Sequence, residues 1–269
     1  MPELPEVQSV VDNLDRHLAG CTINSAAVFW KPTIDRPRLG AFKKSIVSRQ
    51  IRKVSRRGKF IIFSLIPVHR NPSFLLVHLR MSGKLMIGEA LPKGKPGHVR
   101  AQFRLSNGNV LYFQDVRKFG RIYLVSEPEE ITARLGIEPL TKELNQNFLH
   151  KVLSSHSVTL KGFLLRQDLI AGLGNIYVDE VLWKARLSPF RKSNTLTGEE
   201  GGLLCRSIKS ILRSAIRSRG TDFGDNVISD GRYTPKVYGR EGKPCKRCGR
   251  GILKDKVAGR STYYCACCQ

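Results

Sequence analysis

Acidic residues are scarce in this chain, which has 22 Asp and Glu against 46 Lys and Arg among 269 residues. Long apolar runs are missing as well. The longest, from Phe60 to Val68, is interrupted by Ser64 and is too short to cross a bilayer. The first residues carry Glu3 and Glu6 where a secretory leader would be basic. These absences exclude a membrane-spanning protein, and we expect a soluble chain in the cytoplasm.

Cysteine is nearly absent from most of the chain. Five of the seven cysteines lie between positions 245 and 268, which leaves Cys21 and Cys205 isolated. A disulfide framework would need an even spread of cysteines over a small secreted chain. The distribution therefore excludes that class of protein.

The shortage of acidic residues leaves a formal charge of +24 and a pI near 10.2. This excess is larger than solubility requires and implies a polyanionic partner. Nucleic acid is favoured over a membrane surface, because the basic residues are spread through segments with a folded pattern and form no amphipathic basic tail. With 41% hydrophobic residues, the chain can bury a sizeable core in one large domain or two smaller ones.

Four of the clustered cysteines have the spacing of a zinc ribbon. Cys245-x2-Cys248 and Cys265-x2-Cys268 are separated by sixteen residues, long enough for a hairpin that brings two tight turns together. We expect one structural Zn²⁺ held by these four thiolates, with no open position for hydrolysis, and no organic cofactor. Cys267 offers a competing spacing with Cys265, but the two-residue gap suits the turn better, so we expect Cys267 to be a bystander.

The pattern of apolar residues predicts a helix over 5–18 and strands from about 22 to 125. One hairpin is predicted to turn at Asn107-Gly108. An antiparallel β-rich domain follows from this pattern. The clearest strands are expected at residues 23–30, 58–66 and 74–79.

The second half of the chain is predicted to be helical. An acidic segment with Pro128 and Pro139 indicates a linker over 126–141. The junction Gly172-Leu173-Gly174-Asn175 either presents backbone amides to a phosphate or forms a plain turn between helices. Helices are expected at about 144–154, 160–170 and 175–186, followed by a longer one ending at Gly220.

The amino terminus offers a nucleophile. Removal of Met1 would expose the secondary amine of Pro2, with the acid Glu3 beside it. An α-amino group titrates near ~7.7 to 8.0 and a lysine near ~10.4, so far more of the terminal amine is unprotonated at neutral pH. Taken alone, an ordinary N-terminal proline is the simpler interpretation.

Six segments together change that interpretation: Met1–Val7, Ser55–Lys59, His78–Gly83, Asp115–Gly120, Ala171–Tyr177 and the four-cysteine ribbon. Their order along the chain resembles that of bacterial formamidopyrimidine-DNA glycosylases almost end to end. The resemblance implies an α+β multi-domain fold: an N-terminal antiparallel β-sandwich with a preceding helix, a helix-two-turn-helix module and a zinc ribbon. The implied boundaries are 1–125, a linker over 126–141, 142–235 and 236–269.

The resemblance implies a bifunctional enzyme that excises oxidised purines from duplex DNA and then nicks the strand. The damaged nucleotide must first be turned out of the helix. Pro2 would then attack the deoxyribose C1′ to give an iminium, and Glu3 would act as general acid at the sugar ring oxygen. Lys59 matches the lysine of β-elimination. Arg260 matches the zinc-finger arginine of δ-elimination, although clamping a phosphate is an equally good reading.

The resemblance also implies contacts with damaged double-stranded DNA, made by a monomer. Met81, Arg117 and Phe119 match the residues that fill the gap left by the flipped nucleotide. Read without this context, Met81 and Phe119 would be core residues and Arg117 a surface charge.

Three further residues match DNA-contacting positions of the family. Asn175 and His78 match residues that contact the DNA backbone, although His78 is equally readable as a buried strand histidine. Lys161 matches a lysine near the lesion pocket, but Gly162 follows it where the family often has proline.

Two segments depart from the family pattern and leave lesion preference open. Lys95-Pro96-Gly97-His98 stands where the family often has Lys-His-Asp-His, and Arg219-Gly220-Thr221-Asp222 stands in the region that covers the lesion. Gln8 also replaces a frequent glutamate.

Three alternatives remain at this stage. An endonuclease VIII-type glycosylase for oxidised pyrimidines would share Pro2 and Glu3 but usually begins differently and lacks the pattern around Arg117. A catalytically silent zinc-ribbon DNA-binding protein would leave Pro2, Glu3 and Lys59 unexplained. An RNA-binding ribosomal or tRNA-associated module would explain only the charge.

Overall fold

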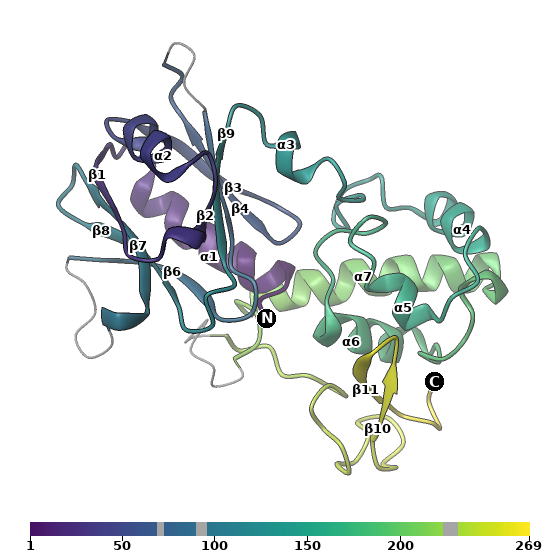
Figure 1. Ribbon diagram of the computed structural model, residues 1–269. Helices are drawn as coiled ribbons and strands as arrows, with labels where there is room; N and C mark the ends of the chain where they lie inside the picture. The colour runs from purple at the N-terminus through teal and green to yellow at the C-terminus, as the bar shows by residue number, and fades with distance from the viewer. Residues whose placement is uncertain (69–72, 90–95, 223–230) are drawn as a thin grey trace. The chain divides into compact units, whose positions relative to one another are not determined.

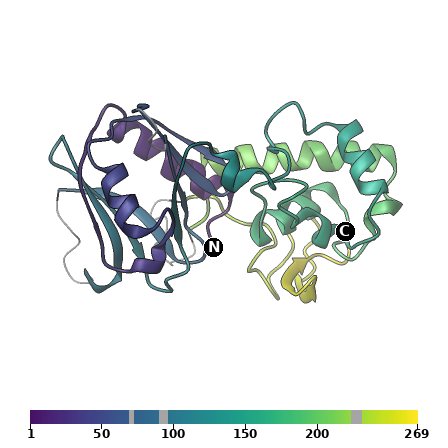
Figure 2. The same cartoon turned by 45° about the horizontal axis from the view of Figure 1, so that its top comes forward.

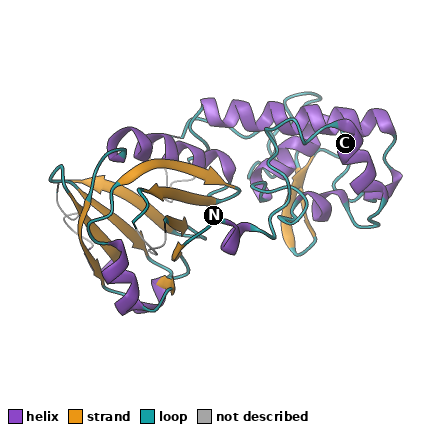
Figure 3. Cartoon of the chain, turned by 90° about the horizontal axis from the view of Figure 1, so that it is seen from above, coloured by secondary structure: helices purple, strands orange, loops and turns teal. Residues whose placement is uncertain are grey.

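The structure is a computed structural model that describes residues 1–68, 73–89, 96–222 and 231–269 (Figure 1). The chain forms two compact units. Of the described residues, the first contains those within 1–2 and 6–133 together with Asp222, and the second contains 3–5, 134–221 and 231–269. Among the described residues, no helix is both long enough and apolar enough to cross a membrane. Strands dominate the first unit and helices the second (Figure 3).

The first unit is a β-sandwich, as the sequence predicts. One sheet has four strands in the order β1-β7-β8-β6, and the other has five in the order β2-β9-β5-β4-β3. Neighbouring strands are antiparallel except β2 and β9, which are parallel. The strands are β1 (Ile23–Val28), β2 (Ile34–Arg36), β3 (Ile51–Arg57), β4 (Phe60–Leu65), β5 (Phe74–His78), β6 (Gly83–Gly88), β7 (Val99–Leu105), β8 (Val110–Asp115) and β9 (Arg121–Val125).

The core of this unit lies between the two sheets and takes in the first helix, α1 (Leu4–Leu18). The apolar positions of α1 recur at helical spacing, so one stripe of the helix packs into that core. Side chains of both sheets meet there, among them Phe63 and Phe103. The hairpin at Asn107-Gly108 is confirmed, since it joins β7 to β8. The stripe of α1 consists of Val7, Val11, Leu14 and Leu18.

A second helix, α2 (Leu39–Ile46), lies in a region that the sequence pattern assigns to strands. It has only eight residues and buries only Phe42 and Ile46, so its periodicity is too short to separate from a strand. Another short helix, α3 (Glu129–Thr132), lies inside the predicted linker. In the part of the chain that the structure describes, three 3₁₀ turns also lie in the connections: Lys31–Thr33, Pro96–His98 and Ser193–Thr195.

The second unit is built from α4 (Gln146–Ser154), α5 (Leu160–Leu164), α6 (Asn175–Ala185) and α7 (Gly198–Arg217). Three predicted helices are confirmed with ends shifted by a few residues. The helix expected over 160–170 ends at Leu164 instead. The side chain of Gln167 explains this, because it bonds to the carbonyls of Leu165 and Leu173 and to the N–H of Gly172, which holds an irregular turn.

Helix α6 is the centre of the second unit. It packs against α7 on one side and against the hairpin of β10 (Leu253–Val257) and β11 (Arg260–Tyr264) on the other (Figures 1 and 2). Nearly all of its residues are buried. A helix that is buried all round is held rigidly by its neighbours. The residues of the candidate site in this unit either belong to α6 or contact it.

Candidate active site and zinc centre

The carboxylate of Glu3 occupies the amino-terminal end of α6. It accepts hydrogen bonds from the backbone N–H of Ile176 at 2.8 Å and of Tyr177 at 3.3 Å, and Glu3 is only 2% exposed. Helix α6 has no side-chain cap of its own, so Glu3 supplies the negative group that a helix amino terminus favours. The sequence left open whether this junction binds a phosphate. In the structure, these two amides bind an anion of the protein itself.

The loop before α6 is shaped to receive this carboxylate. The N–H of Leu4 bonds to the carbonyl of Gly172 at 3.0 Å, which ties the residue after Glu3 to the same loop. At Gly174, a Cβ would lie 2.4 Å from the Cδ of Glu3, far inside van der Waals contact. Only glycine leaves room for the bound carboxylate at this position. Pro2, the predicted nucleophile, is buried and is joined directly to Glu3, while Met1 is exposed.

Lys59 and His78 lie together in the first unit. Lys59 follows Gly58 in the two-residue turn between β3 and β4, and Gly58 has φ +56°, the conformation required at the first position of a type II′ turn. His78 pairs with Phe60 across the next strand, and its ring packs edge-on against the Phe60 ring at 4.6 Å. Lys59 and His78 are both largely buried, at 7% and 8% exposure.

His78 is neutral at physiological pH. Burial lowers its pKa to about 3, with further lowering by the charges of Arg80 and Lys59. Its Nδ1 accepts the backbone N–H of Arg80 at 3.1 Å. A neutral imidazole that accepts at Nδ1 carries its hydrogen on Nε2. His78 can therefore donate one hydrogen bond, as a contact to a phosphate oxygen would require.

Met81, Arg117 and Phe119 meet at the surface of the first unit. Met81 is 44% and Phe119 is 51% exposed, which is unusual for large apolar side chains. The Arg117 guanidinium approaches the Met81 sulfur at 3.4 Å and lies 6.0 Å from the centre of the Phe119 ring. The structure thus brings together the three residues that the sequence predicts to act as a wedge in the DNA.

The buried carboxylate of Asp115 shapes the loop that carries Arg117 and Phe119. It accepts hydrogen bonds from the Ser82 hydroxyl and from the backbone N–H groups of Arg117, at 3.2 Å, and Gly120, at 2.7 Å. Ser82 also accepts from the Arg117 N–H at 3.1 Å. Asp115 therefore ties the Met81 turn and the Arg117 loop together from inside the protein.

In the second unit, Asn175, Lys161 and Arg260 converge on strand β11. The side-chain amide of Asn175 donates to the carbonyl of Ser261 at 2.9 Å, and the Lys161 ammonium donates to the same carbonyl at 2.8 Å. Lys161 is fully buried, although the sequence predicts it as a DNA contact. Arg260, the residue before Ser261, is exposed.

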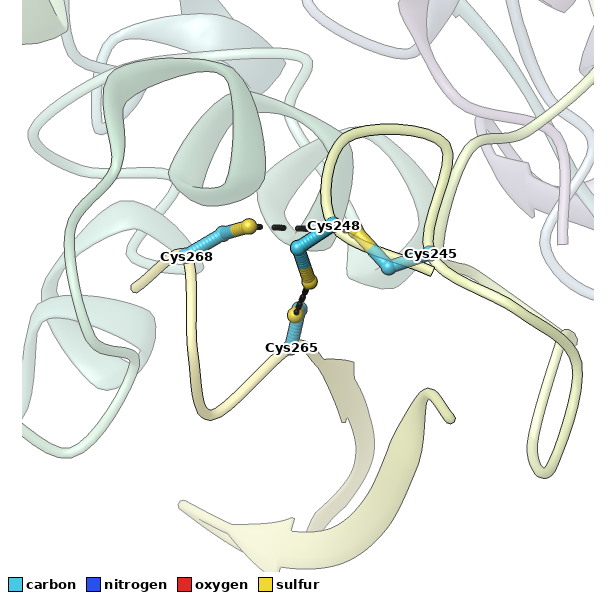
Figure 4. A group of neighbouring side chains, drawn as sticks. All are labelled: Cys245, Cys248, Cys265 and Cys268. Atoms are coloured by element: carbon cyan, nitrogen blue, oxygen red, sulfur yellow. Dashed lines mark hydrogen bonds between the residues drawn. The ribbon is translucent and has the colours of Figure 1, made fainter. Parts of the chain in front are cut away.

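The four predicted zinc ligands form a cluster at the base of this hairpin (Figure 4). All four sulfur atoms lie within 4.8 Å of one another, with Cys245 to Cys268 at 3.9 Å and Cys248 to Cys265 at 3.5 Å. A tetrahedral zinc with Zn–S bonds of about 2.3 Å sets its sulfurs about 3.8 Å apart, so the side chains fit this ion. Among the described residues, Cys267 is not part of this cluster.

Hydrogen bonds around Cys245 favour its thiolate. Burial alone would raise the pKa of Cys245, but hydrogen bonds from the backbone N–H groups of Arg247 and Cys248 lower it to about 6. The indole N–H of Trp183, near the end of α6, also lies 3.5 Å from the Cys245 sulfur. Arg247 stacks on the same indole, 3.9 Å from its centre. Trp183 therefore joins the ribbon to α6.

Several residues of the site were not assigned a role by the sequence. Asp115 and Gly174 lie inside two of the motifs, but the roles predicted for these motifs were assigned to neighbouring residues such as Arg117 and Asn175. Glu180 is fully buried and accepts backbone N–H bonds from residues 236–238 and the Tyr233 hydroxyl, which anchors the segment leading to the ribbon. The signal available in the sequence was the acidic pair Asp179-Glu180 inside an otherwise apolar helix, since buried carboxylates require partners.

Three family models match the chain. They are the formamidopyrimidine-DNA glycosylase N-terminal domain over residues 1–122, the formamidopyrimidine-DNA glycosylase H2TH domain over 135–225, and the zinc finger found in FPG and IleRS over 242–269. A strand sandwich, a helical module and a four-cysteine ribbon in this order define a multi-domain DNA glycosylase. The chain belongs to the formamidopyrimidine-DNA glycosylase family.

Individual proteins agree with this assignment over their full lengths. The chain is 43% identical to formamidopyrimidine-DNA glycosylase of Pelotomaculum thermopropionicum and 42% identical to that of Desulforamulus reducens, covering 100% of this chain and 99% of each relative. A crystal structure of the Lactococcus lactis enzyme in complex with DNA containing N7-benzyl-Fapy-dG superposes with a TM-score of 0.91 at 35% identity, covering 100% of this chain and 99% of that one.

Of the two departures from the family pattern, Lys95-Pro96-Gly97-His98 lies partly outside the described residues, whereas Arg219-Gly220-Thr221-Asp222 lies within them and only the chain that follows it does not. Lys95 is not described, and neither are residues 223–230 of the predicted lesion-covering region.

Proposed function

We propose that this protein excises oxidised purines, such as 8-oxoguanine and formamidopyrimidines, from duplex DNA and then cleaves the strand by β,δ-elimination. The observation that carries the proposal is the placement of Glu3, an acid held by the backbone of α6 directly beside Pro2. Solved complexes of the Lactococcus lactis relative contain Fapy-type and abasic-site DNA, which supports this class of substrate.

Pro2 is the nucleophile in this proposal. Once Met1 is removed, the lone pair of the Pro2 nitrogen attacks C1′ of the flipped nucleotide, and the bond from C1′ to the base breaks with its electrons passing to the base. The attacking nitrogen gives up its proton to the Glu3 carboxylate, Glu3 passes that proton to the sugar ring oxygen, and ring opening leaves an iminium between Pro2 and C1′. The iminium withdraws electrons, which allows loss of a C2′ proton and departure of the 3′ phosphate. A second elimination releases the 5′ phosphate.

Cationic and donor groups then hold the DNA backbone. Lys59 supports β-elimination and binds the adjoining phosphate, the neutral His78 donates through Nε2, and Asn175 contacts the backbone. Arg260 assists δ-elimination from its exposed position on the hairpin. Zinc, when bound by the four cysteines, supplies no open coordination position, so its contribution is to hold this hairpin in place.

Met81, Arg117 and Phe119 replace the extruded nucleotide in the stack. Two exposed apolar side chains beside a guanidinium suit an opened helix, which offers a hydrophobic gap and an unpaired base. Arginine has donors but no acceptor, so it suits the acceptor-bearing edge of cytosine better than adenine. Excision opposite cytosine should therefore be faster than opposite adenine.

Borohydride trapping tests the proposal. The mature protein should form a covalent adduct with duplexes containing 8-oxoguanine, a ring-opened purine or an abasic site, because borohydride reduces the iminium to a stable amine. A version that retains Met1, or carries an N-terminal extension, should form none. Undiminished trapping by the extended protein would move the nucleophile away from Pro2, with Lys59 as the first candidate.

The same assay separates the alternatives. Preference for an oxidised pyrimidine over 8-oxoguanine would indicate an endonuclease VIII-type enzyme. Binding to duplex DNA without any trapped adduct would indicate a silent DNA-binding protein.

A further inference from the structure

A buried ion pair links α5 to α6 in the second unit. The Lys161 ammonium lies 2.7 Å from a carboxylate oxygen of Asp179, and both side chains are 0% exposed. Burial lowers the pKa of Lys161 and raises that of Asp179 to about 7, because surroundings of low polarity disfavour both charges, and each partner opposes that shift in the other. Such a pair contributes little net stability compared with apolar residues of similar size.

Both members of this pair also bind the backbone of β11. Lys161 donates to the carbonyl of Ser261 at 2.8 Å, and the second carboxylate oxygen of Asp179 accepts the N–H of Tyr263 at 2.9 Å. On its other edge, β11 pairs only with β10 in a two-stranded sheet. The pair therefore fixes the edge of β11 on either side of Thr262, which is itself fully buried.

Arg260 is the first residue of this strand and directly precedes Ser261. Its position depends on where the carbonyl of Ser261 is held. Lys161 has no exposed surface from which to contact DNA itself. Its ammonium lies close enough to the Arg260 guanidinium for that positive charge to lower the pKa of Lys161.

We propose that Lys161 and Asp179 are positioning residues that set the location of Arg260 by holding the backbone of β11, and that Lys161 acts through this strand rather than by touching DNA. This inference rests on the role of Arg260 in strand cleavage proposed above. Its consequence is that removing the pair should reduce δ-elimination while base excision and β-elimination persist.

The decisive variant removes both charges at once. In Lys161→Met/Asp179→Leu, no buried charge is left without a partner, so the protein should fold and bind one zinc. The two bonds to β11 are lost, while Asn175 still holds the carbonyl of Ser261. The single variants Lys161→Met and Asp179→Leu each leave one charge buried alone and should be less stable than the double variant.

Strand cleavage on an abasic-site duplex gives the functional readout. The ratio of δ- to β-elimination product should fall about tenfold or more in the double variant, because displacement of a positioned group by about 1 Å can cost as much as a hundredfold. Borohydride trapping should remain near the wild-type level. Adding Arg260→Ala to the double variant should lower the ratio little further, since both changes remove the same function.

An independent readout follows the backbone itself. Hydrogen exchange of the Tyr263 amide should accelerate at least about tenfold in the double variant, because its acceptor on Asp179 is gone. A control is Arg166→Gln/Asp168→Asn, which removes an exposed ion pair of the same unit and should change neither readout.

The outcomes are separable. A double variant with a wild-type product ratio and slow Tyr263 exchange would overturn the inference. Normal stability, faster exchange and an unchanged product ratio would also overturn it, by showing that the pair holds β11 but does not position a functional Arg260. Failure of the wild-type protein to trap any DNA would refute the proposed function instead, while the exchange result would still report whether the pair holds β11.

Discussion

Glu3 owes its orientation to backbone donors, which cannot rotate away as side chains can. Two N–H groups of α6 hold both of its oxygens, and the absence of a side chain at Gly174 leaves the space in which they lie. The acid beside Pro2 is therefore set by a helix end, and the helix is itself fixed by burial. A change at Gly174 should test this arrangement without altering any reacting group.

Gly174→Ala should lower base excision by about 10- to 100-fold. The added Cβ would lie 2.4 Å from the Glu3 Cδ and would displace the carboxylate from two hydrogen bonds worth roughly 1.5–3 kcal/mol each. Single-turnover excision of 8-oxoguanine measures the effect. Gly201→Ala is the matched control, because nothing lies within 4 Å of a Cβ there, and it should leave excision unchanged. Equal rates for the two variants would contradict the role of Gly174.

His78 should make the protein less stable in acid. The pKa of His78 is about 3 in the folded chain, below the ordinary value of 6.5. Between these two pH values the imidazole is protonated in the unfolded chain but neutral in the folded chain. The free energy of unfolding should fall on acidification towards pH 3, by at most about 1.4 kcal/mol per pH unit from this group, and its full contribution is present above pH 6.5. Urea unfolding of wild type and His78→Gln at pH 7 and pH 5.5 measures the slope. An identical slope in both proteins would show that His78 does not cause it.

At the scale of elements, the periodic segments could be predicted and the short ones could not. Helix α1, strands β4 and β5, the β7–β8 hairpin and helix α6 follow from apolar spacing and turn residues within each segment. Helix α2 and the early end of α5 could not, because two buried positions do not define a period and the bonds made by Gln167 join residues outside the helix.

In the candidate site, too, some features could be predicted from the sequence and others could not. The cysteine spacing identifies the zinc cluster because the ligands are close in sequence, and six colinear segments identify the family. The bonds from Ile176 to Glu3 and from Tyr263 to Asp179 join residues far apart in sequence, so no local pattern reports them. Lys161 illustrates the limit: its place in a motif could be predicted, but its complete burial depends on the packing of the hairpin.

Zinc should stabilise the ribbon without entering the chemistry. Among the described residues, the core cluster at the ribbon has only five buried members, one of which, Trp183, belongs to α6, and these are too few to hold β10 and β11 without the metal. Cys248→Ser should lose the one bound zinc and weaken DNA binding, whereas Cys267→Ser should keep both. Metal content and the fluorescence of Trp183, which contacts Cys245, measure the outcome. Loss of zinc on changing Cys267 alone would overturn the assignment of the four ligands.

For the whole molecule, the dominant property is its net charge of +24. Cations that neutralise phosphates release counterions, so affinity for undamaged duplex should fall on the order of a thousandfold between about 50 and 200 mM salt if about six phosphates are contacted. Lys59→Gln should reduce the slope of log affinity against log salt by about one. A titration in several salt concentrations measures this. An unchanged slope would place Lys59 away from the DNA backbone.

The network around Asp115 fixes the backbone of the loop that carries Arg117 and Phe119, and this backbone does not depend on the side chains that the loop exposes. Asp115 and Ser82 fix the backbone from within, whereas Met81 and Phe119 are 44% and 51% exposed and Arg117 lies beside them at the surface. Replacing an outward residue should therefore leave the scaffold intact. The preference for the base opposite the lesion, which we assign to Arg117, can therefore be redesigned in this loop at little risk to folding. The same preference can also change during evolution.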